Sequence, residues 1–297
     1  MPSHRGFILS MGLWLALCPA LAGKAVAAEP IQFYRAESPQ GRVSYFYPSF
    51  HIADARITRP PVAVLGAVKQ LVIEADIGEL QKHPETMVHY ILSPAPLDLA
   101  GLFTPAELDT IRARAACNGI ADHVERLRPF FIGMMVALPC PKPDGVLYEL
   151  VLERAAQERG LKITALESAD EEFAALFSLP DRAFIDEIRK YADDPQAGEH
   201  VVSRMVALYN DSNYDALYDL SLVDLPKNAA DRRLFTYKVL LARNRAMVER
   251  MSAALAEGGA LVMVGALHLP GKDGIVDLLR QRGFKITMVA ASGADLR

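Results

Sequence analysis

Three ionisable side chains in this 297-residue sequence stand at the ends of predicted β-strands. His51 ends the first predicted strand, Glu74 ends the next, and His268 follows a later strand after a three-residue turn. Ligands of an open parallel sheet bind outside the carboxyl ends of its strands, so we expect these groups to converge on one crevice. Two imidazoles and a carboxylate can hold a first-row divalent ion and leave positions open for water or substrate.

A second interpretation of the same residues needs no metal. Glu74 directly follows an apolar run, where an unpaired carboxylate near the core of a sheet is costly. A bound cation would offset that cost, but Glu74 could instead cap a helix or pair with an arginine. Each histidine would then make ordinary hydrogen bonds. Spacing alone leaves both interpretations open.

A long predicted helix over residues 232–257 offers another candidate for the site. Its apolar stripe, at helical spacing, consists of Tyr237, Leu240, Leu241, Met247, Val248, Met251 and Leu255. Asn244 falls in the middle of this stripe, and Arg243 lies on its flank. A buried amide must find hydrogen-bond partners, so Asn244 either orders the core or faces a polar site.

The elements that must position these residues alternate between strand and helix at both ends of the chain. The predicted units are strand 43–51, helix 62–68 and strand 69–74, and later strand 260–264, helix 274–281 and strand 284–289. Strand–helix–strand units form parallel sheets. We therefore predict an α/β fold with a central, mostly parallel sheet and such βαβ units at both ends of the chain.

The middle of the chain is predicted to be largely helical. Thr104 and Glu107 are spaced as a capping box around Pro105, and Asn118-Gly119 supplies a helix stop. Further helices are expected over 147–159, 184–191, 201–218 and 232–257, with one strand at 161–166. This large helical region completes the expected single domain, residues 29–297.

The N-terminus is typical of a secretory signal peptide over residues 1–28. A charged start precedes an apolar run over residues 6–22, which closes in a small-residue stretch ending at Ala27 and Ala28. We expect cleavage near these alanines, a periplasmic or secreted protein, and no transmembrane segment afterwards. Lipidation of Cys18 is a weaker alternative, because a leucine stands where a small residue is wanted.

Charge and cysteine content narrow the function further. The net charge is -4, and the signal segment carries basic but no acidic residues, so the mature chain is still more acidic. An acidic chain without a basic stripe is a poor candidate for binding nucleic acid. Cys117 and Cys140 remain after cleavage, and in an oxidising compartment they form either one disulfide or a pair of buried thiols.

Five ordered stretches of the sequence resemble the motifs of the TraB/GumN (TraB/PrgY/GumN) family. They are Phe50-His51-Ile52-Ala53-Asp54, Leu71-Val72-Ile73-Glu74, Ala165-Leu166-Glu167, the stretch around Arg243-Asn244, and residues 264–274 around His268. This family is similar to the Tiki proteins, which are proposed metalloproteases, and its α/β fold resembles that of ChaN-like haem-binding proteins and of EreA-like erythromycin esterases. The resemblance covers nearly the whole mature chain.

The resemblance implies an exported metal-dependent hydrolase that acts on peptides or another small-molecule substrate. The resemblance implies that the divalent ion, Mn, Co or Zn, is bound by His51, Glu74 and His268. It implies as catalytic residues Glu74, Arg243, Asn244 and Glu167. Glu74 would be either a metal ligand or the general base. Arg243 or Asn244 would stabilise the developing oxyanion, and Glu167 would support the site.

One departure from the family pattern concerns the first histidine motif. Pro48 stands where the family has glycine, and proline fixes φ and lacks an N–H. We therefore expect the turn that presents His51 to differ from the family's turn. The departure favours an alternative function, a non-catalytic haem- or peptide-binding periplasmic protein. A purely structural periplasmic scaffold is the third hypothesis.

Overall fold

The computed structural model describes residues 32–76, 84–142, 144–223 and 228–290. The predicted signal peptide, residues 1–28, lies outside the described residues. None of the helices in the described part of the chain has the length and apolar composition needed to cross a lipid bilayer.

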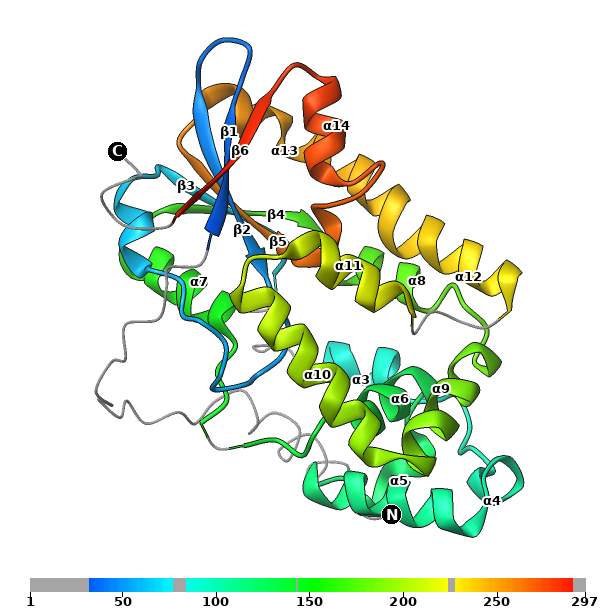
Figure 1. The fold of residues 1–297 in the computed structure, drawn as a ribbon. Helices are drawn as coiled ribbons and strands as arrows, with labels where there is room; N and C mark the ends of the chain where they lie inside the picture. Colours follow the sequence, from blue (N-terminus) through cyan, green and yellow to red (C-terminus); the bar gives the residue numbers. More distant parts are fainter. Residues whose placement is uncertain (1–31, 77–83, 143, 224–227, 291–297) are drawn as a thin grey trace.

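A six-stranded sheet with the order β4-β3-β5-β2-β1-β6 forms the centre of the fold (Figure 1). Its strands are β1 (Gln32–Glu37), β2 (Val43–Ser49), β3 (Gln70–Ala75), β4 (Lys162–Glu167), β5 (Ala260–Gly265) and β6 (Lys285–Ala290). Strands β2, β3, β4 and β5 are parallel, whereas β1 is antiparallel to both of its neighbours. The prediction of an α/β fold with a mostly parallel sheet is confirmed.

The strand–helix–strand units at both ends of the chain connect strands that are not neighbours. The first unit runs through the 3-10 helix η2 (Val62–Gly66), but β5 lies between β2 and β3. The last unit runs through α14 (Ile275–Gln281), and β2 and β1 lie between β5 and β6. This order brings the ends of β2 and β3 to either side of the end of β5.

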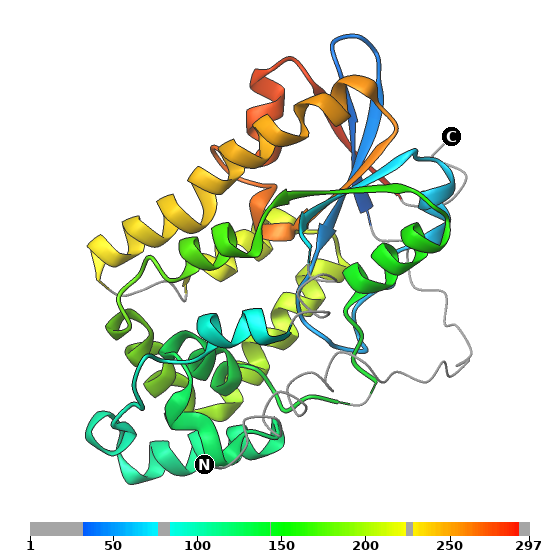
Figure 2. The ribbon, with the colours of Figure 1, turned by 180° about the vertical axis from the view of Figure 1, so that it is seen from behind.

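Two groups of helices surround two separate apolar cores (Figures 1 and 2). Those packed with the sheet are α7 (Tyr148–Glu158), α10 (Pro195–Asn210), α11 (Tyr214–Val223), α13 (Ala242–Glu257) and α14. The second core lies among α3 (Pro84–Ile91), α4 (Leu99–Leu102), α5 (Pro105–Cys117), η3 (Ala121–Arg126), α6 (Pro129–Ala137) and α9 (Arg182–Asp193). Helix α10 reaches from the second group to the sheet (Figure 1).

Two predicted helices differ from those observed. The stretch 201–218 is divided between α10 and α11, and Ser212 between them has a positive φ of 55°. The stretch 232–257 is divided into α12 (Ala229–Phe235), a π-helix η4 (Thr236–Leu241) and α13. A π-helix has more residues per turn than an α-helix, so it shifts the face on which each side chain lies. Tyr237, expected in the apolar stripe, is accordingly 50% exposed.

The predicted capping box is present at the start of α5, where the side chains of Thr104 and Glu107 each accept a hydrogen bond from the other's backbone N–H. Helix α5 ends at Cys117, which forms a disulfide with Cys140 in the segment after α6. Of the two alternatives for these cysteines, the structure contains the disulfide. The bond ties the segment leading toward α7 to the second helical group.

We expect the disulfide to stabilise the fold by restricting the unfolded chain. The two cysteines are 23 residues apart, and a loop of this length corresponds to about 3 kcal/mol of unfolding free energy. The double variant Cys117→Ser/Cys140→Ser should therefore unfold at lower urea concentration under oxidising conditions. Reductant should lower the urea midpoint of the wild type to that of the variant and leave the variant's midpoint unchanged. Equal midpoints for both proteins without reductant would contradict this prediction.

Candidate functional site

His51 lies in a tight turn directly after β2. The N–H of Ile52 donates to the carbonyl of Phe50 over 2.8 Å, so the turn is centred on His51. Tyr209 of α10 holds this turn, because its hydroxyl donates to the Pro48 carbonyl over 2.8 Å and its ring stacks on Phe50 with centroids 4.9 Å apart. Strand β2 and helix α10 together position the imidazole.

Pro48 belongs to the strand and not to the turn. It pairs in parallel register with Val264 of β5, while β1 pairs with β2 only as far as Phe46. The described pairs between β1 and β2 thus stop short of Pro48, and a strand tolerates proline where a neighbouring strand does not pair with it. The turn that presents His51 begins after Pro48, so proline in place of the family's glycine acts on the strand end.

Glu74 is a buried carboxylate near the end of β3. Its Oε2 accepts a hydrogen bond of 2.6 Å from the N–H of Gly265, at the end of neighbouring β5. Its Oε1 accepts from Nη2 of Arg243 over 2.6 Å. Strand order explains both contacts, because β3 lies directly beside β5 and α13 packs on this part of the sheet.

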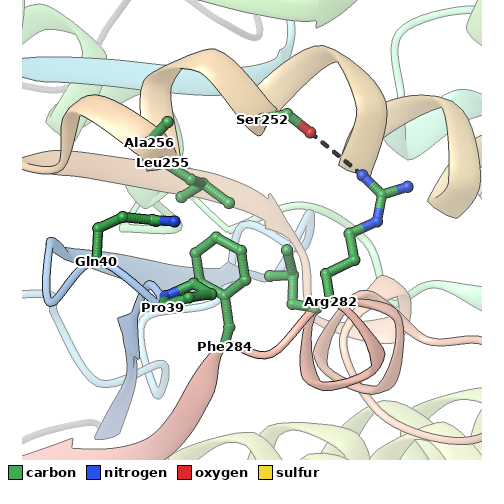
Figure 3. A pocket seen from close by; sticks show the side chains of 8 residues that line it. Pro39, Gln40, Ser252, Leu255, Ala256, Arg282 and Phe284 are labelled. Carbon is green, nitrogen blue, oxygen red and sulfur yellow. Dashed lines mark hydrogen bonds between the residues drawn. The ribbon is translucent and has the colours of Figure 1, made fainter.

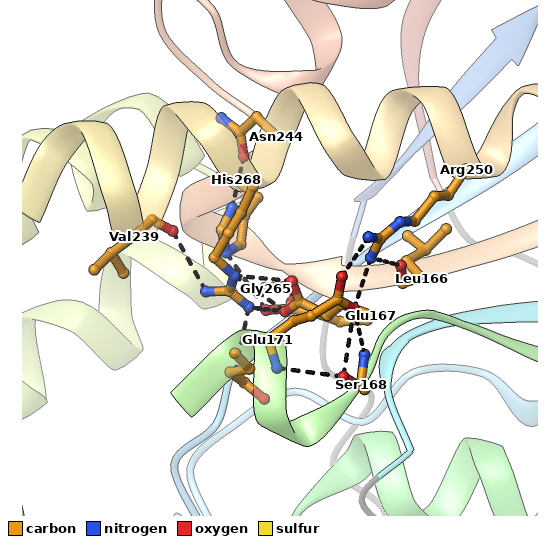
Figure 4. A network of polar contacts seen from close by, with 12 residues as sticks. Leu166, Glu167, Ser168, Glu171, Val239, Asn244, Arg250, Gly265 and His268 are labelled. Atoms are coloured by element: carbon orange, nitrogen blue, oxygen red, sulfur yellow. Dashed lines mark hydrogen bonds and ion pairs between the residues drawn. The ribbon is translucent and has the colours of Figure 1, made fainter. Parts of the chain in front are cut away.

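His268 follows β5 in the short 3-10 helix η5 (Ala266–His268) and is buried. The Asn244 amide nitrogen donates to the Asp273 carbonyl over 3.0 Å, which directs its oxygen at Nδ1 of His268, 2.6 Å away (Figure 4). An amide oxygen only accepts, so Nδ1 carries the proton. The other nitrogen, Nε2, lies 3.4 Å from Oε1 of Glu74.

The three predicted ligands meet at Gly265. A Cβ atom placed on this glycine would lie 3.3 Å from Oε2 of Glu74, 3.3 Å from Nε2 of His51 and 3.5 Å from Cδ2 of His268. Any two of these atoms are therefore no farther apart than the sum of their two distances to this Cβ position. The structure brings together two imidazoles and one carboxylate from three distant parts of the chain, and a side chain at position 265 would crowd Glu74 and His51 and contact His268.

Glu149, a residue that the sequence analysis did not single out, contacts His51. It lies in the first turn of α7, and its Oε1 accepts a hydrogen bond of 2.8 Å from Nδ1 of His51. Desolvation lowers the pKa of His51, but the hydrogen bond and the charge of Glu149 outweigh it and raise the pKa to about 9. A helical spacing shared with Leu152 and Ala156 places Glu149 on the buried face of α7, and this signal is visible in the sequence.

Arg243 is the cation at the centre of a buried acidic cluster. Its Nε donates to both carboxylate oxygens of Glu167, over 3.0 and 3.1 Å, and its Nη2 contacts Glu74, Glu167 and Glu172. Ligand atoms of these three glutamates lie within 4.8 Å of one another. The pairing of Glu74 with an arginine, one alternative from the sequence, is thus present, and Glu74 still faces both imidazoles.

The cluster shifts the pKa values of its carboxyl groups in opposite directions. Burial opposes ionisation of Glu74, but the charges of His268, His51 and Arg243 outweigh it and hold its pKa below 4.5. Burial raises the pKa of Glu172, and the charge of Glu74 raises it further. Glu172 keeps 26% of its side chain exposed, whereas Glu74 and Glu167 are enclosed.

A separate cavity of about 210 Å³ lies away from these residues (Figure 3). It opens between the β1–β2 turn, the end of α13, and the region from α14 to β6. Its lining consists of Pro39, Gln40, Ser252, Leu255, Ala256, Leu279, Arg282 and Phe284. Arg282 there donates to Ser252, and none of the predicted site residues takes part.

Replacing Arg243 with methionine should leave Glu74 and Glu167 as uncompensated buried charges. We expect Arg243→Met to lower the unfolding free energy by about 3–5 kcal/mol near neutral pH. Because the pKa of Glu74 is lowered in the fold, the unfolded chain takes up the proton first, and wild-type stability declines as pH falls below about 5. The variant should show a flatter decline, measured by urea unfolding between about pH 4 and 7.

Arg250→Met is the matched control for this experiment. Arg250 lies on the same helix, but its ion pair with Glu171 is exposed, so its loss should change stability by less than about 1 kcal/mol. Equal effects of the two substitutions at every pH would show that burial of the Arg243 network contributes nothing.

Comparison with known proteins places the chain in a family. Residues 33–288 match the model of the TraB/PrgY/gumN family. This match includes the six site residues predicted from the sequence, which are His51, Glu74, Glu167, Arg243, Asn244 and His268. No curated protein and no solved structure matches the chain significantly. The match covers most of the chain, beginning within β1 and ending within β6. The chain belongs to the TraB/PrgY/gumN family.

Proposed function

We propose that the protein is an exported metal-dependent hydrolase, with peptides as the favoured substrates, and that His51, Glu74 and His268 bind its divalent ion. One observation carries the proposal. Both histidines donate from Nδ1 to a side-chain oxygen, which turns Nε2 of His268 to within 3.4 Å of Oε1 of Glu74 and Nε2 of His51 to within 3.3 Å of the Cβ position of Gly265, where Oε2 of Glu74 also lies. Imidazoles that bind metals are oriented in this way, with the second nitrogen bonded to a carboxylate or carbonyl oxygen.

The types of donor present suit a divalent first-row ion, while the described ligand atoms that lie within 4.8 Å of one another belong to Glu74, Glu167 and Glu172. Two imidazole nitrogens and a carboxylate suit Zn, Co or Mn, and three protein ligands leave coordination positions open. The Gly265 N–H and Arg243 stabilise the charged form of Glu74, which is the form that binds a cation. Membership of the family is the established part, and the metal and the reaction are proposed from this donor set.

The contacts divide the roles among the site residues. Arg243 directs its donors to glutamates and to the Val239 carbonyl, and Asn244 is engaged with His268 and Asp273, so we assign both to positioning rather than to oxyanion binding. Glu74 is best suited as a ligand. A bound ion would polarise the scissile carbonyl and acidify a water molecule.

Glu172 is the carboxyl group that we assign to proton transfer. It is the most exposed of the three clustered glutamates, and its raised pKa brings it closer to the range useful for a general base. The alternative of a non-catalytic haem- or peptide-binding protein rested on Pro48 and on the resemblance to ChaN-like proteins, and only the first of these grounds is a feature of the site. Because Pro48 lies in β2 and not in the turn of His51, it no longer favours that alternative.

The purified protein should bind one divalent ion per chain. Equilibrium dialysis with Mn²⁺, Co²⁺ or Zn²⁺ followed by elemental analysis measures this, and the ion should raise the melting temperature. His51→Ala and His268→Ala should each weaken binding by more than about 100-fold, since ligand loss exceeds the effect of losing an outer partner. His200→Ala, an exposed position on α10, should bind as the wild type does. Absence of stoichiometric metal from the wild type would refute the metal site.

Peptide cleavage should depend on the metal and on the assigned residues. With a library of peptides, activity should disappear in His268→Ala. Glu172→Gln should lower kcat by about 10²–10⁴-fold while metal still binds, because only the proton-transfer group is changed. Cleavage that persists in His268→Ala, or in the presence of chelator, would contradict the proposed mechanism.

A further inference from the structure

The carboxylate of Glu149 is buried and bonded through one of its two oxygens. The residue is 3% exposed, its Oε1 accepts from Nδ1 of His51, and its Oε2 is buried without a hydrogen-bond partner among the described residues. A buried carboxylate oxygen without a donor opposes folding. Its place in the first turn of α7 compensates partly, since helix N-termini favour negative charge.

The loop that follows His51 is in close backbone contact with the segment that leads into α7. A Cβ on Gly145 would lie 2.5 Å from the carbonyl oxygen of Ala53, so the two backbones touch there. Arg59, beyond the same loop, donates to the Tyr148 hydroxyl over 3.2 Å. The start of α7 is therefore fixed relative to the turn that carries His51, and Glu149 reaches the imidazole from a rigid base.

His51 is the least enclosed of the three site residues. Half of its side chain, 51%, is exposed, whereas Glu74 and His268 are buried and held by Gly265, Arg243 and Asn244. Among the described residues, the hydrogen bond to Glu149 is the polar contact that the structure gives the His51 ring. The hydrogen bond that one imidazole nitrogen makes determines which of the two ring nitrogens carries the proton.

We propose that Glu149 is a positioning residue that fixes the neutral His51 imidazole as the Nδ1–H tautomer, with Nε2 directed at the point beside Gly265 where Glu74 and His268 also lie. Only one part of this inference, the identity of the group that Nε2 binds, rests on the proposed function. The tautomer and the orientation of the ring follow from Glu149 whether or not a metal is present.

The variants Glu149→Leu and Glu149→Gln test this role. Leucine removes the acceptor, and glutamine keeps an acceptor oxygen without the charge. The first readout is the tautomer of His51 in the metal-free protein, from imidazole ¹⁵N shifts at about pH 10, above the His51 pKa of about 9. The second is the dissociation constant for Co²⁺ with its visible spectrum, and the third is the melting temperature without metal.

We expect Glu149→Leu to shift the tautomer away from Nδ1–H and to weaken Co²⁺ binding about 10–100-fold, as loss of an outer partner does. Glutamine should rescue both in part. The metal-free melting temperature, measured at about pH 10 where His51 is neutral, should stay the same or rise, because an unpartnered buried oxygen is removed. Glu153→Leu is the matched control, since Glu153 is equally buried one turn later and accepts from Gln157 instead.

An unchanged tautomer in Glu149→Leu would overturn the inference. So would a lower melting temperature combined with an unchanged Co²⁺ affinity, which marks a structural ion pair. A wild type that binds no Co²⁺ would refute the proposed function, but the tautomer measurement would still decide the role of Glu149.

Discussion

The buried carboxylate of Glu74 is the constraint around which this part of the fold is organised. An ionised group at the end of a central strand must be surrounded by donors and cations, because water does not reach it. The donors come from a strand end through Gly265 and from α13 through Arg243, and η5 places Nε2 of His268 beside the same carboxylate. Three elements distant in sequence thus contact the two oxygens of one carboxylate, and this carboxylate with the two imidazoles is the candidate site.

Helix α13 supplies two adjacent residues with separate tasks. Arg243 binds Glu74 and the edge-strand residue Glu167, and Asn244 orients the ring of His268. Consecutive residues on a helix point in directions about 100° apart, so one helix reaches both groups at once. The π-helix η4 immediately precedes this pair, and the Val239 carbonyl within it accepts from Arg243. Such π-helical turns are frequent at functional sites.

The His51 side of the site is held by a different set of elements. Tyr209 of α10 fixes the backbone before the turn, and Glu149 of α7 fixes the ring itself. The site is therefore enclosed between α13 on one side and α7 with α10 on the other. It lies where the carboxyl ends of β2, β3 and β5 meet, the position at which parallel sheets bind their ligands.

Sequence alone determined the strand ends that carry His51, Glu74 and His268, the capped start of α5, and the motifs that mark the family. These features are local, since periodicity, capping residues and short motifs depend on neighbours along the chain. Periodicity reports which face of an element is buried but not what covers it. The placement of β5 between β2 and β3, the contact of Glu149 with His51 and the exposure of Tyr237 depend on packing between distant segments, and only the tertiary structure decided them.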